Sequence, residues 1–151
     1  MKAVIVCEST HHGNTRKLVD AIAAKFAVEV CDIAQADTID LNAYELIGFA
    51  SGISYGKFYE KITSVLREAL PGGKKVFFLY TCAQNSGDFS ESIRRLAEEK
   101  GCESVGSYGC KGFNTYGPLK LIGGMNRKHP DENELQGAVD FFASILSSIS
   151  H

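Results

Sequence analysis

Residues 2–26 read KAVIVCESTHHGNTRKLVDAIAAKF, and this stretch decides the class of fold that we expect. Its first part, Lys2–Cys7, is a short and continuous apolar run of the kind that forms a buried parallel strand. Its last part, Thr15–Phe26, places apolar residues at helical spacing. The polar loop Glu8–Gly13 lies between the two. A buried strand followed by an amphipathic helix is the repeating unit of a parallel α/β sheet.

The same alternation continues along the rest of the chain. Four further segments have the pattern of buried strands: Val28–Asp32, Leu46–Ala50, Lys75–Tyr80 and Ser104–Cys110. Three further segments have an apolar stripe at helical period: Lys57–Leu70, Asp88–Lys100 and Glu132–Ile149. No helix is predicted between the second and third strands, because Ala34–Ala43 is short and mixed. The pattern predicts one α/β domain over residues 1–151, a five-stranded parallel sheet between two layers of helices.

Local signals mark two helix starts and one long connection. Asp88–Glu91 and Asp131–Glu134 both have the D-x-x-E spacing of a capping box, which predicts that helices begin there. The connection Lys111–Pro130 is rich in glycine and has little periodicity. Connections of this length in a compact domain are usually functional or disordered. This one follows the last strand, so it begins at the sheet edge where open α/β folds bind ligands.

Composition and charge exclude several classes of function. The formal net charge is −2 and no dense Lys/Arg run is present, so nucleic acid is not the expected partner. No apolar run is long enough for a membrane span, and the apolar start of the chain is too short for a signal peptide. We therefore expect a cytoplasmic location.

The cysteines indicate neither a disulfide framework nor a zinc site, because the five of them are scattered and form no C-x-x-C pair. Four are interpreted as small buried side chains: Cys7, Cys31, Cys102 and Cys110. Cys82 differs from these, because it follows the fourth predicted strand and so lies near the ligand edge of the sheet.

The first loop predicts an anion site. A helix N-terminus offers backbone N–H groups and the positive end of the helix dipole. A pyrophosphate needs several glycines for close approach, whereas this loop has only Gly13 and is rich in hydroxyl, amide and imidazole groups. Such donors suit a terminal phosphate monoester.

A P-loop is excluded because its motif is absent, and a tyrosine phosphatase because its phosphate-binding arginine would stand at Gly13. A response-regulator receiver needs an aspartate after the third strand, where Ser51 stands.

The run Ser9–Thr15, STHHGNT, resembles the S/T-x-S/T-x-G-N-T phosphate loop of the flavodoxin family. The likeness extends over nearly the whole chain, and Lys111–Pro130 is similar to the ending of short microbial flavodoxin-like proteins. It implies a sheet of order 2-1-3-4-5 and one bound FMN. It also implies that Ser9, His11, Gly13, Asn14 and Thr15 bind the phosphate, although a hydroxyl residue is common where His11 or His12 stands.

Two further loops complete the expected flavin site. In flavodoxins the loop after the third strand supplies an aromatic wall, here Tyr55, Phe58 or Tyr59, and a turn glycine, here Gly56. Tyr55 is the better wall residue, because Phe58 belongs to a core stripe. The loop after the fourth strand passes the pyrimidine edge and places Cys82 beside the ring, either as a thiol near the flavin or as a filler. The expected cofactor-binding residues are Ser9, Thr10, His11, His12, Gly13, Asn14, Thr15, Ser51, Gly52, Ile53, Ser54, Tyr55, Gly56, Lys57, Thr81, Cys82, Ala83, Gln84, Asn85 and Gly87.

The function implied by this resemblance is that of a low-potential electron carrier that docks transiently with redox partner proteins such as reductases and oxidases. An FMN-dependent NAD(P)H:quinone or flavin reductase is the alternative, with Lys111–Pro130 as one wall of its substrate site. A flavin-free binding module is the second alternative. No general base is evident, since His129 is interpreted as a surface residue before a helix cap. Lys57 stands where family members often carry an acidic residue, and we hypothesise that it raises the potential of the bound flavin.

Overall fold

The computed structural model describes residues 1–8, 13–83, 87–111 and 129–150. The strands are β1 (Ala3–Glu8), β2 (Glu29–Asp32), β3 (Leu46–Ser54), β4 (Lys57–Phe58), β5 (Lys75–Cys82) and β6 (Glu103–Lys111). The α-helices are α1 (Asn14–Ala23), α2 (Glu60–Ala69), α3 (Glu91–Glu99) and α4 (Glu132–Ile149). Two short 3-10 helices, η1 (Ile33–Thr38) and η2 (Leu41–Ala43), occupy the connection for which the sequence predicts no α-helix.

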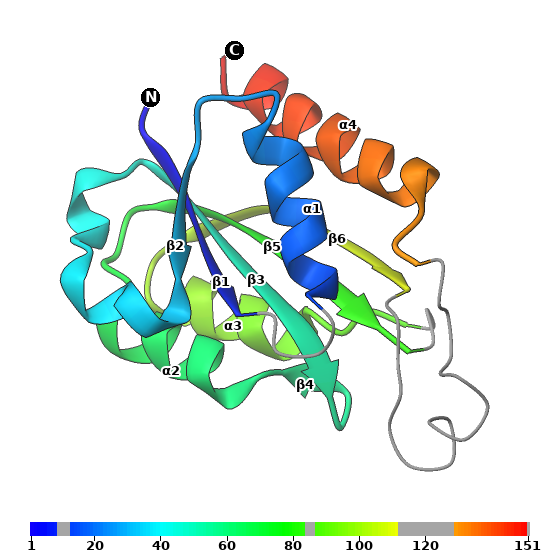
Figure 1. The fold of residues 1–151 in the computed structure, drawn as a ribbon. Helices are drawn as coiled ribbons and strands as arrows, with labels where there is room; N and C mark the ends of the chain where they lie inside the picture. The colour runs from blue at the N-terminus through cyan, green and yellow to red at the C-terminus, as the bar shows by residue number, and fades with distance from the viewer. Residues whose placement is uncertain (9–12, 84–86, 112–128, 151) are drawn as a thin grey trace.

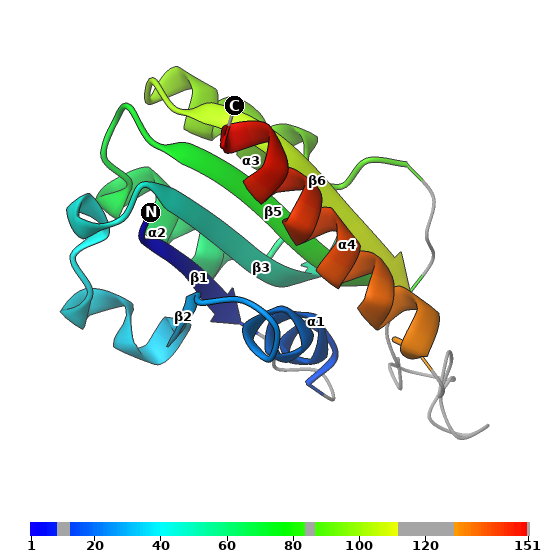
Figure 2. The same cartoon turned by 90° about the horizontal axis from the view of Figure 1, so that it is seen from above.

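The sheet has the strand order β2-β1-β3-β5-β6, and every neighbouring pair along this path is parallel. Counting the five long strands in chain order gives 2-1-3-4-5, so the predicted fold is confirmed. The sheet lies between two helical layers, with α1 and α4 on one face and α2 and α3 on the other (Figures 1 and 2). The carboxyl ends of the parallel strands therefore share one edge. β2 lies on one side of β1, whereas β3, β5 and β6 lie on the other side, so the order of the strands reverses between β1 and β3.

Strand alternation divides the core into two clusters. Ile5, Phe77 and Leu79 pack beneath α1 and α4, whereas Val6 and Phe78 pack beneath α2 and α3. All five side chains are fully buried. Because successive strand residues point to opposite faces, the uninterrupted apolar runs of the sequence are what a sheet covered on both faces requires.

The segment after β3 differs from the prediction. Residues Lys57–Phe58 form β4, which pairs antiparallel with the end of β3, and α2 begins only at Glu60. The turn is made by Tyr55 and Gly56, which both have positive φ, 53° and 77°. This is the conformation of a two-residue type I′ hairpin turn. The helix predicted from Lys57 was therefore wrong at its start, because the hairpin takes up the residues before Glu60.

The two predicted capping boxes have different outcomes. At α4 the Asp131 carboxylate accepts from the Glu134 N–H, the Glu134 carboxylate accepts from the Asp131 N–H, and the box is confirmed. The prediction at Asp88 was wrong. The Asp88 carboxylate accepts from the backbone N–H and the hydroxyl of Ser90 and from Arg94, so the helix starts after Ser90. These hydrogen bonds, first those from Ser90 and then that from Arg94, hold the pKa of Asp88 below its usual value.

Candidate functional site

The three loops that the sequence singled out all leave the same edge of the sheet. They follow β1, β3 and β5, whose register sets Glu8 beside Ser51 and Gly52 beside Thr81. The edge includes the point between β1 and β3 where the order of strand addition reverses. Open α/β folds bind ligands in the crevice at such a point. The fold therefore brings the flanks of all three predicted loops together (Figure 1).

The N-terminus of α1 lies at this edge. Gly13 is the N-cap residue, with a left-handed φ of 64°, and no side-chain capping bond forms there. The first turn contains no acidic residue, so no carboxylate of its own offsets the positive end of the helix dipole. Asn14 and Thr15 are buried. This is the arrangement that the predicted anion site requires. The predicted residues Ser9, Thr10, His11 and His12 lie outside the described residues.

One buried hydrogen bond joins the first loop to the third. The hydroxyl oxygens of Thr15, in the first turn of α1, and of Thr81, near the end of β5, are 2.8 Å apart. Both side chains are buried. Because the bond joins the start of α1 to the end of β5, it links the first loop to the third.

We expect Thr15→Val to lower the free energy of unfolding by about 1–2 kcal/mol, because it leaves the buried Thr81 hydroxyl without this partner. Adding Thr81→Val should recover part of the loss, since both ends of the bond are then apolar. Denaturant unfolding of the two single variants and the double variant measures this coupling. Strictly additive losses would show that the two hydroxyls do not stabilise each other.

The start of the second loop is held by its own side chains. The Ser51 hydroxyl accepts from the Tyr59 N–H at 2.9 Å and donates to the Gly52 carbonyl at 2.6 Å. A Cβ on Gly52 would lie 2.3 Å from the Tyr59 hydroxyl oxygen. The absence of a side chain at Gly52 thus lets Tyr59 lie against the strand, and the Ser51 hydroxyl holds the backbone of Tyr59. Their contact with a ligand stays a prediction.

The aromatic residues of this loop have distinct environments. Phe58 is buried against Phe78 and Tyr80, with ring centroids 6.0 and 5.8 Å away, which confirms its interpretation as a core residue. Tyr55 is fully exposed and is the one described non-glycine residue with positive φ. An exposed aromatic ring in a conformation that disfavours non-glycine residues is typical of a functional position. Tyr55 therefore stays the predicted wall residue.

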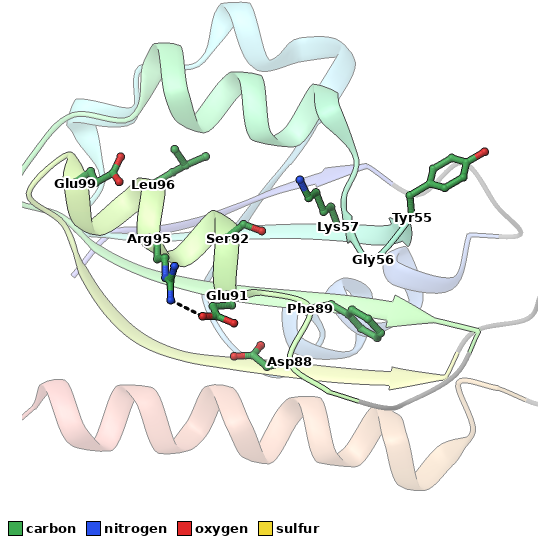
Figure 3. A pocket seen from close by; sticks show the side chains of 10 residues that line it. All are labelled: Tyr55, Gly56, Lys57, Asp88, Phe89, Glu91, Ser92, Arg95, Leu96 and Glu99. Carbon is green, nitrogen blue, oxygen red and sulfur yellow. Dashed lines mark hydrogen bonds and ion pairs between the residues drawn. The ribbon is translucent and has the colours of Figure 1, made fainter.

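A shallow cleft of about 530 Å³ lies between the β3–β4 hairpin and α3. In Figure 3 the Lys57 side chain extends from the hairpin toward α3, whereas Tyr55 points away from the cleft. Arg95 and Glu91 form an ion pair of 2.6 Å on the opposite wall. Lys57 forms no ion pair with another described residue. The lysine is thus an unneutralised charge at the turn where the flavin ring is predicted.

Only part of the third loop is described. Thr81 and Cys82 end β5, Ala83 follows, and Gly87 has a φ of 83°. The Cys82 thiol is buried in the core cluster under α2 and α3 and donates to the Cys110 carbonyl at 3.5 Å. This packing is what the filler interpretation expects. Gln84 and Asn85, together with residues 112–128 of the long connection, lie outside the described residues.

Two other groups near this edge, the Cys7 thiol and the His129 imidazole, are held within the fold. Burial raises the pKa of the Cys7 thiol to about 12, so it does not supply the thiolate that a phosphatase needs. His129 Nδ1 is hydrogen-bonded to the Glu134 carboxylate and lies 3.8 Å from Asp131, where it forms part of the start of α4. The interpretation of His129 as a residue before a helix cap is consistent with these contacts.

Glu8 is the residue that sequence reasoning missed. The sequence pattern places Glu8 in the first loop, whereas in the structure it is the last residue of β1 and only 6% exposed. Within the part of the chain that the structure describes, its Oε2 atom has no hydrogen-bond partner. The signal in the sequence was an acidic residue directly after an apolar strand, which a solvated loop explains equally well.

Comparison with known proteins identifies the family. The family described as Flavodoxin domain matches residues 5–101, well over half of the chain. The chain belongs to the flavodoxin family. An uncharacterized protein of Methanocaldococcus jannaschii is 36% identical over 150 residues, covering 98% of this flavodoxin and 100% of the relative.

Solved structures agree with this flavodoxin in fold. A flavodoxin from the domain Archaea matches with a TM-score of 0.63 and 22% identity over 100% of both chains. The oxidised flavodoxin 2 of Bacillus cereus matches with a TM-score of 0.65 and 19% identity over 98% of this chain and 99% of the other. At such identities the likeness extends to the fold alone. No helix among the described residues is long and apolar enough to cross a membrane.

Proposed function

We propose that this flavodoxin binds one FMN at the carboxyl edge of its sheet and carries electrons at low potential between redox proteins. The observation that carries the proposal is the N-terminus of α1, which has Gly13 as its N-cap residue, lacks a side-chain cap and lies beside the β1–β3 reversal point. A phosphate monoester is the ligand that such a helix end and a loop of hydroxyl donors suit best. Membership of a family that typically binds FMN supports the same conclusion.

The residues of the three loops suit two parts of an FMN, its phosphate and its ring. Gly13, Asn14 and Thr15, with the hydroxyls and imidazoles of residues 9–12, would hold the phosphate. The β3–β4 hairpin at Ser54–Lys57 and the loop after Thr81 would flank the ring. FMN, when bound, supplies the electron-transfer chemistry, and the protein sets its orientation and electrostatic surroundings.

The shape of the cleft favours a carrier over an enzyme. The cleft beside the hairpin is open, and five of its ten lining residues are charged and exposed, whereas the pockets that hold small substrates are concave and have only a few polar groups. A carrier also needs neither a general base nor a substrate pocket, only an accessible cofactor edge. We therefore propose transient docking with a reductase and an oxidase in the cytoplasm.

Spectroscopy of the purified protein tests this proposal. We expect a yellow holo-protein with the visible absorption of FMN, which bleaches slowly under anaerobic NADH or NADPH and rapidly once a flavodoxin reductase is added. Rapid bleaching without a reductase would replace the carrier with an FMN-dependent NAD(P)H oxidoreductase. A colourless protein that FMN does not stabilise would instead support a flavin-free binding module.

We expect Lys57→Glu to lower the reduction potential of the bound flavin, on the order of tens of millivolts. Reduction adds negative charge to the ring, and the unneutralised lysine at the hairpin favours that charge, whereas a glutamate repels it. Potentiometric titration of both proteins measures the change. Lys61→Glu, an exposed change of the same charge on α2, is the control. Equal potentials for the wild-type and Lys57→Glu proteins would show that Lys57 does not act on the flavin.

A further inference from the structure

Glu8 is buried at a cost that the described residues do not offset. A carboxylate oxygen removed from water without a hydrogen-bond donor destabilises the folded state. The Glu8 side chain is 6% exposed, and among the described residues its Oε2 has no hydrogen-bond partner and its carboxyl group forms no ion pair. A buried polar atom left in this way calls for an explanation, and one explanation is a ligand that supplies the missing donor.

The position of Glu8 indicates where that ligand lies. Glu8 ends β1 and is the register partner of Ser51 on β3, so it stands at the reversal point of the sheet. Strand alternation places it on the same face as Val6, toward α2. The Ser51 hydroxyl donates its proton to the Gly52 carbonyl, so it is not a donor to Glu8. An unsatisfied acceptor therefore lies at the edge between the first and second loops.

The chemistry of a carboxylate selects among the three parts of FMN. An ionised carboxylate only accepts hydrogen bonds, and it repels the anionic phosphate. The N–H group of the ring lies in the region predicted for the loops after β3 and β5. The ribityl chain joins the phosphate to the ring, and so passes the β1–β3 edge, and it carries hydroxyl donors.

We propose that Glu8 accepts a hydrogen bond from a ribityl hydroxyl of FMN and so recognises the polyol chain of the cofactor. This inference rests on the proposed binding of FMN. In this assignment the buried carboxyl group of Glu8 serves to recognise the ligand, and its burial lowers the stability of the apo-protein. It therefore predicts opposite effects of one substitution, weaker FMN binding together with an apo-protein that is at least as stable.

The variants Glu8→Gln and Glu8→Leu test this inference, with flavin fluorescence quenching for FMN affinity and thermal unfolding for the apo-proteins. We expect the dissociation constant of FMN to rise about tenfold in Glu8→Gln and further in Glu8→Leu, because a hydrogen bond to a charged acceptor is lost. The unfolding midpoint of each apo-variant should equal or exceed that of the wild type. Glu68→Gln, at an exposed position on α2, is the matched control and should change neither quantity.

A phosphoalkyl flavin, in which hydrogen replaces the ribityl hydroxyls, identifies the part of FMN that Glu8 contacts. Wild type and Glu8→Gln should bind this analogue with the same affinity, because the donor is absent from both complexes. Three results would overturn the inference: FMN affinity within twofold of wild type in both variants, an equal loss with the analogue, or a Glu8→Gln apo-protein that is less stable than wild type. A wild-type protein that does not bind FMN would instead refute the proposed function itself.

Discussion

Gly48→Ala is expected to lower the free energy of unfolding by about 3 kcal/mol. A Cβ at this position in the middle of β3 would lie 2.3 Å from Cζ of Phe77 on the neighbouring strand β5. The Phe77 ring is fully buried and packs against Phe141 and Phe142, with centroid distances of 6.2 and 5.6 Å. It therefore has no space into which to move, and either the ring or the strand must leave its position. Urea unfolding followed by circular dichroism measures the loss.

A second substitution makes this explanation specific. Phe77→Leu shortens the side chain and removes the atoms that the new methyl group would meet. The double variant Gly48→Ala/Phe77→Leu should be more stable than the sum of the two single losses predicts. Additive losses would mean that Gly48 is needed for a reason other than the space that the Phe77 ring takes up.

FMN is expected to raise the free energy of unfolding of the apo-protein by about 4 kcal/mol when the free ligand exceeds its dissociation constant a thousandfold. Binding to the folded state alone stabilises it by mass action. The N-terminus of α1 should contribute much of this affinity through the phosphate, because Gly13 leaves that helix end without a side-chain cap. Chemical unfolding at several FMN concentrations gives both the stabilisation and the dissociation constant.

Riboflavin is the matched control for this experiment, since it has the ring and ribityl chain of FMN and lacks the phosphate. At the same free concentration it should stabilise the protein far less than FMN does. Equal stabilisation by the two flavins would show that the helix end does not hold the phosphate, and the first loop would then need another function.

Features that depend on a few neighbouring residues could be predicted from the sequence. The apolar run of β1, the stripe of α4 and the Asp131–Glu134 capping box are all local patterns, and all three are confirmed. The same reasoning failed at Lys57, where a helical stripe extends into residues that pair with β3 instead. It also failed at Asp88, whose carboxylate binds Ser90 and Arg94 rather than capping the helix. At Lys57 pairing with β3 overrides the helical stripe. At Asp88 local hydrogen bonds to Ser90 and Arg94 take the carboxylate away from the cap position.

The first loop and its flanks show which features follow from neighbouring residues and which follow from the packing of the whole sheet. The run from β1 through Gly13 to α1 fixes the fold class and predicts an anion site, because strand period, helix period and a turn glycine act over a few residues. The tertiary structure decided that Thr15 bonds Thr81, 66 residues away, and that Glu8 is buried beside Ser51. These contacts follow from the register of parallel strands, and register is set by the packing of the whole sheet rather than by neighbours in the chain.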